Sequence, residues 1–188
     1  MSTLEVNTIN PQSGTTITIG GSGDTVSLGS GATQSGFGGV NTPFFYGTKA
    51  SDQTLTRGVE TKITGFTNDE IDTNSSFDGT TFTVPSGGAG KYFFNVNLFC
   101  DFTSIGSDGE LLRAKFYYNG SASNHQGIFR TSGSVRNVGQ CTINYSFIKT
   151  IAVGDTIEVY SYLADGDDSG NGKVSASASC FMGFKLVE

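Results

Sequence analysis

KYFFNVNLFCDF, residues 91–102, is the most informative segment of the chain. Its odd-numbered positions mix polar residues with two phenylalanines, Phe93 and Phe99. Its even-numbered positions are all apolar: Tyr92, Phe94, Val96, Leu98, Cys100 and Phe102. Because successive side chains of a strand point to opposite faces, this alternation predicts one long strand with its even face toward a core.

Other apolar runs with turn residues between them occur on both sides of this segment. The runs cover residues 44–47, 59–65, 80–84, 111–118, 141–148, 157–162 and 174–187. Asn119-Gly120 is a strong hairpin dipeptide, and a second turn is expected at Gly154-Asp155. Short strands with regular turns predict an all-β sandwich or barrel. In the last run, the even positions, such as Met182 and Phe184, are expected to face the core.

Composition limits the classes of partner. The chain has 188 residues, a net charge of −6, 15 Phe and 7 Tyr. The aromatic content is enough to fill a core and argues against general disorder. The acidic balance and the absence of a Lys/Arg cluster argue against nucleic acid and against anionic membranes. The sequence has no apolar run long enough to span a membrane, so insertion into a membrane is not expected.

The sequence shows no constellation of catalytic residues. His125 is the only histidine and lies in a polar stretch that we expect to be a surface loop, and no GxSxG motif occurs. Cys100, Cys141 and Cys180 form no CxxC pair and are expected to be small buried hydrophobic residues. The turn DGDDSGN, residues 165–171, is rich in oxygen ligands but lacks EF-hand spacing. We therefore expect no enzymatic activity, no cofactor and no metal site.

The N-terminal region differs from the rest of the chain. TITIG at residues 16–20 and TVSLG at residues 25–29 match position by position. Each predicts a short alternating strand that ends at glycine. Copies on neighbouring chains would bury the apolar side chains in layers around a threefold axis: Ile17, Ile19, Val26 and Leu28. We expect residues 1–36 to be this trimerising anchor and residues 37–43 a linker, although a flexible Gly/Ser linker throughout is the alternative.

Several aromatic residues of the remaining region, residues 44–188, lie on the register opposite to the expected core. They are Phe93, Phe99, Tyr160, Tyr162 and Phe181. Exposed apolar patches usually mark an interface, and interface cores favour aromatic residues. These five are therefore expected to line a contact between copies of the chain, with a second core layer as the alternative.

Four segments in order resemble the jelly-roll heads of complement C1q and the tumour necrosis factor superfamily. They are FTVP with GKYFF (residues 82–85 and 90–94), YNG (118–120), VGDTIEV (153–159) and SCFMGFKL (179–186). The likeness covers about residues 44–188, and residues 86–89 lengthen one loop relative to the family pattern. It implies a ten-strand, two-sheet jelly roll that assembles as a homotrimer through aromatic faces.

Residues 4–31 resemble the N-terminal segments of appendage proteins of tailed phages, especially marine ones. This second likeness implies a virion fibre protein whose N-terminus attaches to other virion proteins and whose head contacts a host glycan or protein. Without a recognisable signal peptide, we expect synthesis in the host cytoplasm and a final location in the virion. A capsid decoration protein, a lectin-like module of a bacterial surface and a fibre-borne hydrolase are the alternatives.

Binding residues often lie on long polar loops between strands. Residues 121–137 and 164–173 are the two candidates in the expected head. Their charged side chains are the predicted receptor contacts: His125, Arg130, Arg136, Asp165, Asp167 and Asp168.

Overall fold

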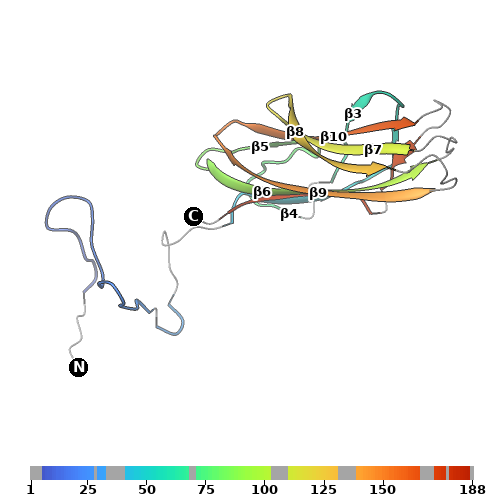
Figure 1. The fold of residues 1–188 in the computed structure, drawn as a ribbon. Helices are drawn as coiled ribbons and strands as arrows, with labels where there is room; N and C mark the ends of the chain where they lie inside the picture. The colour runs from blue at the N-terminus through green and yellow to red at the C-terminus, as the bar shows by residue number, and fades with distance from the viewer. Residues whose placement is uncertain are drawn as a thin grey trace. The chain divides into compact units, whose positions relative to one another are not determined.

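The computed structural model describes residues 6–27, 29–32, 41–67, 71–102, 110–130, 139–165, 172–176 and 178–186. The chain divides into two units, residues 1–38 and residues 39–188 (Figure 1). The part of the chain described by the structure contains no helix that is long and apolar enough to cross a membrane.

The second unit consists of two β-sheets packed face to face (Figure 1). One sheet has seven strands: β1 (Phe44–Thr48), β2 (Gln53–Leu55), β4 (Ile71–Asp72), β6 (Gly90–Phe102), β9 (Gln140–Ile151), β11 (Gly172–Val174) and β12 (Cys180–Lys185). The other has five: β3 (Glu60–Lys62), β5 (Thr81–Thr83), β7 (Glu110–Tyr118), β8 (Ser121–Arg130) and β10 (Thr156–Asp165). The described residues thus form twelve strands rather than the expected ten, because segments as short as β4 and β11 add to the larger sheet.

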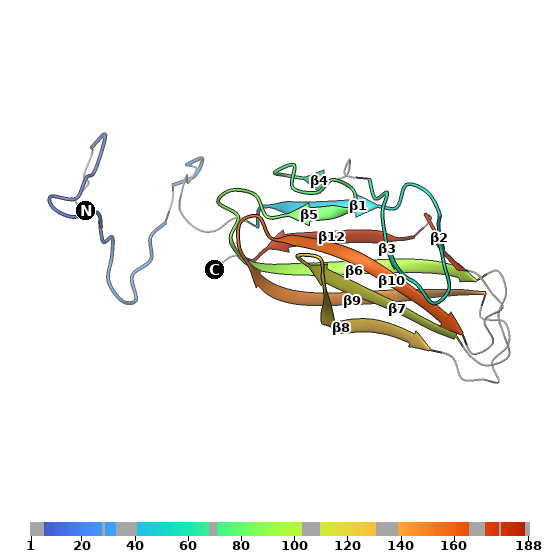
Figure 2. The ribbon, with the colours of Figure 1, turned by 90° about the horizontal axis from the view of Figure 1, so that it is seen from above.

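The strands pair in the antiparallel sense, and the chain crosses repeatedly between the sheets (Figure 2). The first strand, β1, pairs with the last, β12, so that Phe45 lies opposite Gly183. Strand β6 lies between β9, which pairs with no other strand of the seven-stranded sheet among the described residues, and the two strands β11 and β12. In the five-stranded sheet, β10 pairs with β3, β5 and β7, and β8 forms the edge next to β7.

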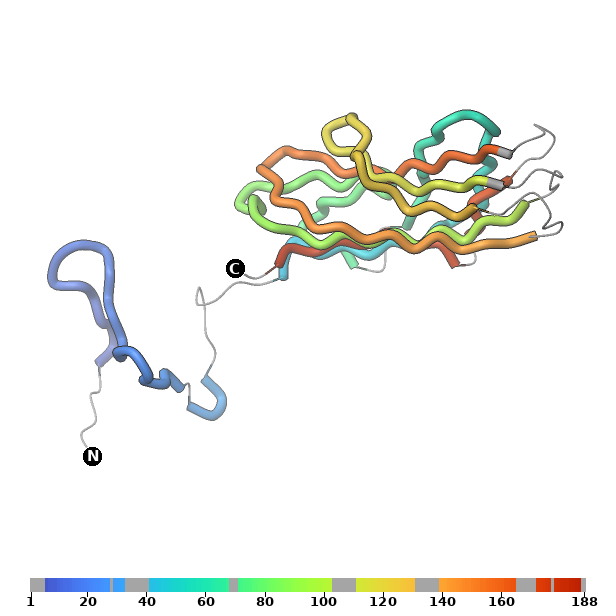
Figure 3. Tube along the Cα trace, in the orientation of Figure 1, coloured from blue at the N-terminus to red at the C-terminus, as the bar shows by residue number. Residues whose placement is uncertain are grey.

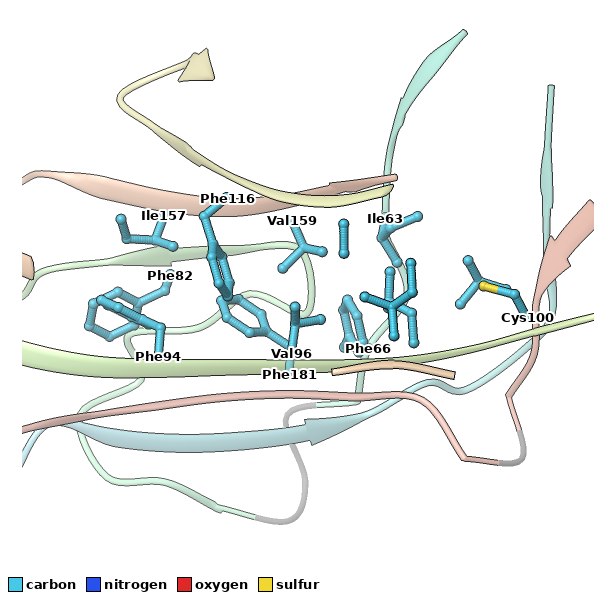
Figure 4. Close-up of a cluster of buried hydrophobic side chains, with 14 of the residues drawn as sticks. Ile63, Phe66, Phe82, Phe94, Val96, Cys100, Phe116, Ile157, Val159 and Phe181 are labelled. Carbon is cyan, nitrogen blue, oxygen red and sulfur yellow. The ribbon is translucent and has the colours of Figure 1, made fainter. Parts of the chain in front are cut away.

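The even face of β6 is buried, as its alternation predicted. Of the six apolar side chains predicted to face the core, five have no exposed surface and the sixth, Phe102, is 9% exposed. Phe94 and Val96 meet Phe116, Ile157 and Val159 of the five-stranded sheet (Figure 4). Full burial of such a side chain stabilises the fold by roughly 1.5–3 kcal/mol.

The end of the chain has a register different from the predicted one. Val174 and Phe181 are both buried although one position is even and the other odd. The strand expected over residues 174–187 is interrupted after β11, where the backbone N–H of Ser175 donates to the Phe99 carbonyl. The irregular segment between β11 and β12 shifts the alternation by one residue, which exchanges the two faces of β12. Phe181 therefore packs in the core, 4.9 Å from the ring centroid of Phe45, while Met182 and Phe184 face outward.

The polar stretch that follows Asn119-Gly120 is a strand rather than the predicted loop. Asn119 and Gly120 have φ values of 48° and 73°, the left-handed pair that a tight hairpin turn of type I′ requires. The turn aligns β8 with β7, with Tyr118 opposite Ser121. Residues 121–130 contain few bulky apolar side chains, so the strand was not evident from the sequence, and His125 lies within it.

The three cysteines lie in two different environments. Cys100 and Cys141 are buried and face each other across β6 and β9. The neighbouring Cys141 thiol and burial hold the pKa of Cys100 above its usual range. Cys180 is only half-buried because β12 has the opposite register, so the expectation that all three lie in the core is wrong for this residue.

The first unit contains turns and extended segments (Figure 3). The carboxylate of Asp24 accepts a hydrogen bond from the backbone N–H of Gly21 at 2.6 Å and closes one turn. Ile17, Ile19 and Val26 are 40%, 59% and 64% exposed. The alternating strands expected here do not form within the described residues of the single chain. Pairing between chains stays a prediction, and Leu28 lies outside the described residues.

Candidate functional site

The outer face of the seven-stranded sheet carries an apolar row across four strands. Phe44 lies opposite Phe184, which lies opposite Phe93, which in turn lies opposite Ile148. The ring centroids are 6.0 Å apart for Phe44 and Phe184 and 5.4 Å apart for Phe93 and Phe184. The three rings are half-buried, and Ile148 is 59% exposed. We call these four residues the phenylalanine row.

The polar groups beside the phenylalanine row bond within the sheet. The Asn95 amide donates to Asn144 Oδ1 at 3.0 Å and to Ser146 Oγ at 2.7 Å. The Asn97 amide donates to the Ala178 carbonyl at 2.7 Å. Amides with partners of this kind lose little when a second surface covers them, because each donor keeps its acceptor.

The outer face of the five-stranded sheet has a different chemistry. The ring of Tyr160 stacks on that of Tyr117 with centroids 3.7 Å apart. The Arg113 guanidinium lies over the Tyr162 ring, 5.0 Å from its centroid. We call Tyr117, Tyr160, Tyr162 and Arg113 the tyrosine face.

Ion pairs surround the tyrosine face. Lys62 Nζ lies 2.6 Å from Glu158 Oε1, and Lys115 Nζ lies 3.2 Å from Glu60 Oε1. Burial and a hydrogen bond to Glu60 raise the pKa of Tyr117 to about 12. The phenol is therefore neutral at physiological pH, and the face carries balanced pairs together with the Arg113 charge.

The structure divides the five predicted interface residues among three places. Phe93 and Phe99 lie on the outer face of the seven-stranded sheet, Tyr160 and Tyr162 lie on the outer face of the other sheet, and Phe181 is in the core. The expectation that Phe181 faces outward is wrong, because of the register shift before β12.

The sequence analysis did not predict that three members of the phenylalanine row lie on an outer face: Phe44, Phe184 and Ile148. It also missed Met182, which lies two residues before Phe184 on the same face of β12. Phe184 and Met182 were assigned to the core because the shift between β11 and β12 is invisible in the alternation. Phe44 and Phe45 are adjacent and equally apolar, so the pattern does not indicate which ring faces the core.

A cleft lies at one edge of the sandwich, where residues of β7 and the start of β8 meet β9. Its volume is about 410 Å³, and its lining combines aromatic rings with hydroxyl, amide and imidazole groups: Phe116, Tyr118, Ser121, Ala122, Ser123, Asn124, His125, Phe147, Ile148 and Lys149. Lys149 Nζ lies 4.1 Å from the centroid of the Tyr118 ring. We call this the edge cleft.

Asp155 ties together the two turns beside the edge cleft. Its carboxylate accepts hydrogen bonds from the Tyr118 hydroxyl at 2.6 Å, the Asn119 amide at 2.8 Å and the backbone N–H of Ala152 at 2.7 Å. The bonds from Asn119, Tyr118 and Ala152 lower the pKa of Asp155, because they stabilise its charged form. The same bond to Asp155 raises the pKa of Tyr118.

The predicted receptor contacts are only partly described. His125 and Arg130 are exposed on β8, and β10 ends at Asp165. Arg136, Asp167 and Asp168 lie outside the described residues. The described part of the chain contains no group of three or more His, Cys, Asp or Glu side chains that could hold a metal ion.

Comparisons with known proteins bear on the fold. The sequence matches no protein-family model and no curated protein. The structure is similar to murine APRIL at pH 5.0, with a TM-score of 0.51 and 11% identity over 76% of this chain and 98% of that one. Murine APRIL at pH 8.0 gives a TM-score of 0.49 and 11% identity over the same shares. The globular domain of zebrafish complement 1qA gives 0.48 and 15% identity over 77% of this chain and 97% of that one.

The predicted all-β jelly-roll sandwich is therefore confirmed. The two-sheet architecture shows it, and the APRIL match with the TM-score of 0.51 supports it. At 11% identity this likeness concerns the fold alone.

Proposed function

We propose that this chain is a non-enzymatic virion protein, a homotrimeric jelly-roll head that an N-terminal anchor attaches to the particle. The observation that carries the proposal is the phenylalanine row. Its three rings are half-buried and Ile148 is exposed, on a sheet face where the amides of Asn95 and Asn97 already have partners. Three neighbouring phenylalanine rings on one outer face are typical of an interface rather than of a solvated surface.

A ring of three copies needs two different surfaces that fit each other. A closed threefold assembly uses a heterologous contact, in which one patch of each subunit meets a second patch of the next. The rings of Phe44, Phe93 and Phe184 in the phenylalanine row would be one patch, without Ile148, which also lines the edge cleft. The edge cleft, lined by Phe116 and Phe147, is the aromatic counterpart that could receive it.

The first unit supports attachment through the N-terminus. It exposes Ile17, Ile19 and Val26 and has too little apolar surface for a core of its own. Alternating short segments of this kind gain stability when they pair with other strands and bury one face. The other chains of the trimer and proteins of the particle are the proposed partners.

Light scattering during size-exclusion chromatography of the full chain tests the assembly. The expected mass is three times the 19.7 kDa of one chain. A single-chain mass across the accessible concentration range would refute the proposal, because the phenylalanine row would then remain in water.

Incorporation into particles tests the virion role separately. Immunogold labelling should place the protein on purified virions. Replacement of Ile17, Ile19, Val26 and Leu28 by serine should abolish incorporation while the head keeps its circular dichroism spectrum. Unchanged incorporation of this variant, or the absence of label from virions, would overturn the anchor assignment.

A further inference from the structure

The tyrosine face lies on the sheet opposite to the one that carries the phenylalanine row, so covering the row leaves it open. We propose that the tyrosine face binds an acidic polysaccharide of the host surface. The inference rests on the proposed attachment function and names the ligand class and the surface that binds it.

The charge of this face differs from that of the chain. The chain has a net charge of −6. By the strand pairing, the described charged side chains on the outer face of the five-stranded sheet are Lys62, Arg113, Lys115, Arg130, Glu60 and Glu158. The two glutamates pair with the two lysines, and neither arginine pairs with a carboxylate among the described side chains. The face therefore offers a positive charge to an anionic ligand.

The rings provide the contact area for a sugar. Tyrosine offers a large, rigid, amphipathic surface with little conformational entropy to lose. The Arg113 guanidinium lies over the Tyr162 ring, with Cζ 5.0 Å from the ring centroid. A guanidinium in this position can bind a carboxylate through two parallel hydrogen bonds while the neighbouring ring contacts the apolar side of the sugar.

Two polar atoms of this face lack a hydrogen-bond partner within the described structure. Arg113 Nε is a buried donor and Gln126 Oε1 is a buried acceptor. Arg113 lies opposite Ile128 and Lys115 lies opposite Gln126, so these side chains belong to adjacent rows of β7 and β8. Leaving such groups unpaired is costly, and a ligand that both donates and accepts would satisfy both once the two side chains rotate and expose these atoms. A sugar hydroxyl has this dual capacity.

The same chemistry disfavours an acidic protein as the partner. Protein interfaces have an apolar centre with polar groups at the rim. Here Ile128 is the one large aliphatic side chain that is more than half exposed among the described residues of the face, and ion pairs flank the tyrosine rings. A hydrated polymer rich in hydroxyl groups suits such a surface better.

Affinity electrophoresis of the full chain tests the inference. The native protein is run in gels that contain polygalacturonate, neutral dextran or polyglutamate. Retardation is expected in polygalacturonate, less at high salt because ionic screening weakens the arginine contacts. None is expected in dextran and little in polyglutamate. Arg113→Gln and Tyr162→Leu should each weaken binding roughly tenfold, as for central interface residues.

A matched control removes one positive charge elsewhere. Lys91 lies on β6 of the other sheet. The Lys91→Gln variant should therefore bind polygalacturonate like the unchanged protein. Equal weakening by Lys91→Gln, equal retardation by polyglutamate or absence of retardation by polygalacturonate would each overturn the inference. Variants are compared only if their mass in solution equals that of the unchanged chain. A chain that still assembles and enters particles but ignores polygalacturonate refutes the ligand and leaves the proposed function standing.

Discussion

The two outer faces of the sandwich both display aromatic rings, but the groups around those rings differ. On the seven-stranded sheet, Phe93 and Phe184 lie beside amides whose hydrogen bonds close within the sheet. On the five-stranded sheet, Tyr162 lies beside Arg113. Surplus aromatic residues alone do not identify an interface between copies. The hydrogen-bond state of the neighbouring polar groups distinguishes a surface that can be covered from one that needs a ligand.

The difference has an energetic basis. Covering the ion pair of Lys115 and Glu60 would remove two charges from water, a penalty that their mutual attraction often fails to offset. Covering the phenylalanine row removes apolar surface from water, which is favourable at roughly 25 cal/mol per Å². Self-association is therefore expected through the phenylalanine row and not through the tyrosine face.

The largest expected effect on stability distinguishes the face of β12 that packs in the core from the face that points outward. Phe181→Ala should destabilise the fold by about 3–5 kcal/mol, because it opens a cavity among the rings of Phe45, Phe77 and Phe116. Phe184→Ala should cost the folded subunit much less. Urea unfolding of both variants at one protein concentration measures the difference. Equal losses, or a greater loss for Phe184→Ala, would mean that the register of β12 is wrong.

The thiol of Cys180 reports directly on whether a second surface covers the outer face of the seven-stranded sheet, where the phenylalanine row lies. Cys180 lies half-buried on that face, whereas Cys100 and Cys141 are in the core. Burial raises the pKa of Cys180, so its reaction with iodoacetamide is slow near neutral pH. Phe93→Ser, which should open the interface, is expected to increase the labelling of Cys180 several-fold in mass spectrometry.

The two core cysteines provide the internal control for this labelling. They should stay unmodified in both proteins. Identical labelling of Cys180 with and without Phe93→Ser would show that no second surface covers the face.

The smallest expected effect concerns Asp155 beside the edge cleft. Its pKa lies below the ordinary value of 3.8, so its hydrogen bonds stabilise the fold above that pH. The contribution is lost as the pH falls through the lower pKa of the folded state. Asp155→Asn should thus be less stable than the unchanged chain at pH 7, with a smaller difference at acidic pH below the folded pKa. Urea unfolding at both pH values measures this, and a constant difference would contradict it.

Much of the fold was predictable from single segments. The alternation of residues 91–102 predicted β6 and its buried face, and Asn119-Gly120 predicted the turn after β7. Both signals are local, since a strand alternates along its own length and a tight turn depends on two backbone conformations.

The outer faces were less predictable, because they depend on register between distant segments. The interruption after β11 turns Phe181 toward the core and Phe184 outward, the reverse of the predicted faces, and no residue type marks it. Strand β8 forms because the hairpin aligns it with β7, although its own sequence is polar. Which aromatic residues share a face therefore follows from the pairing of strands.

One set of mass measurements tests the central distinction between the faces most directly. Native mass spectrometry would compare the full chain with Phe93→Ser/Phe184→Ser and with Tyr160→Ser/Tyr162→Ser. The expected result is a trimer for the unchanged chain, single chains for the phenylalanine variant and a trimer for the tyrosine variant. Single chains for the tyrosine variant, or a trimer for the phenylalanine variant, would contradict the assignment of the two faces.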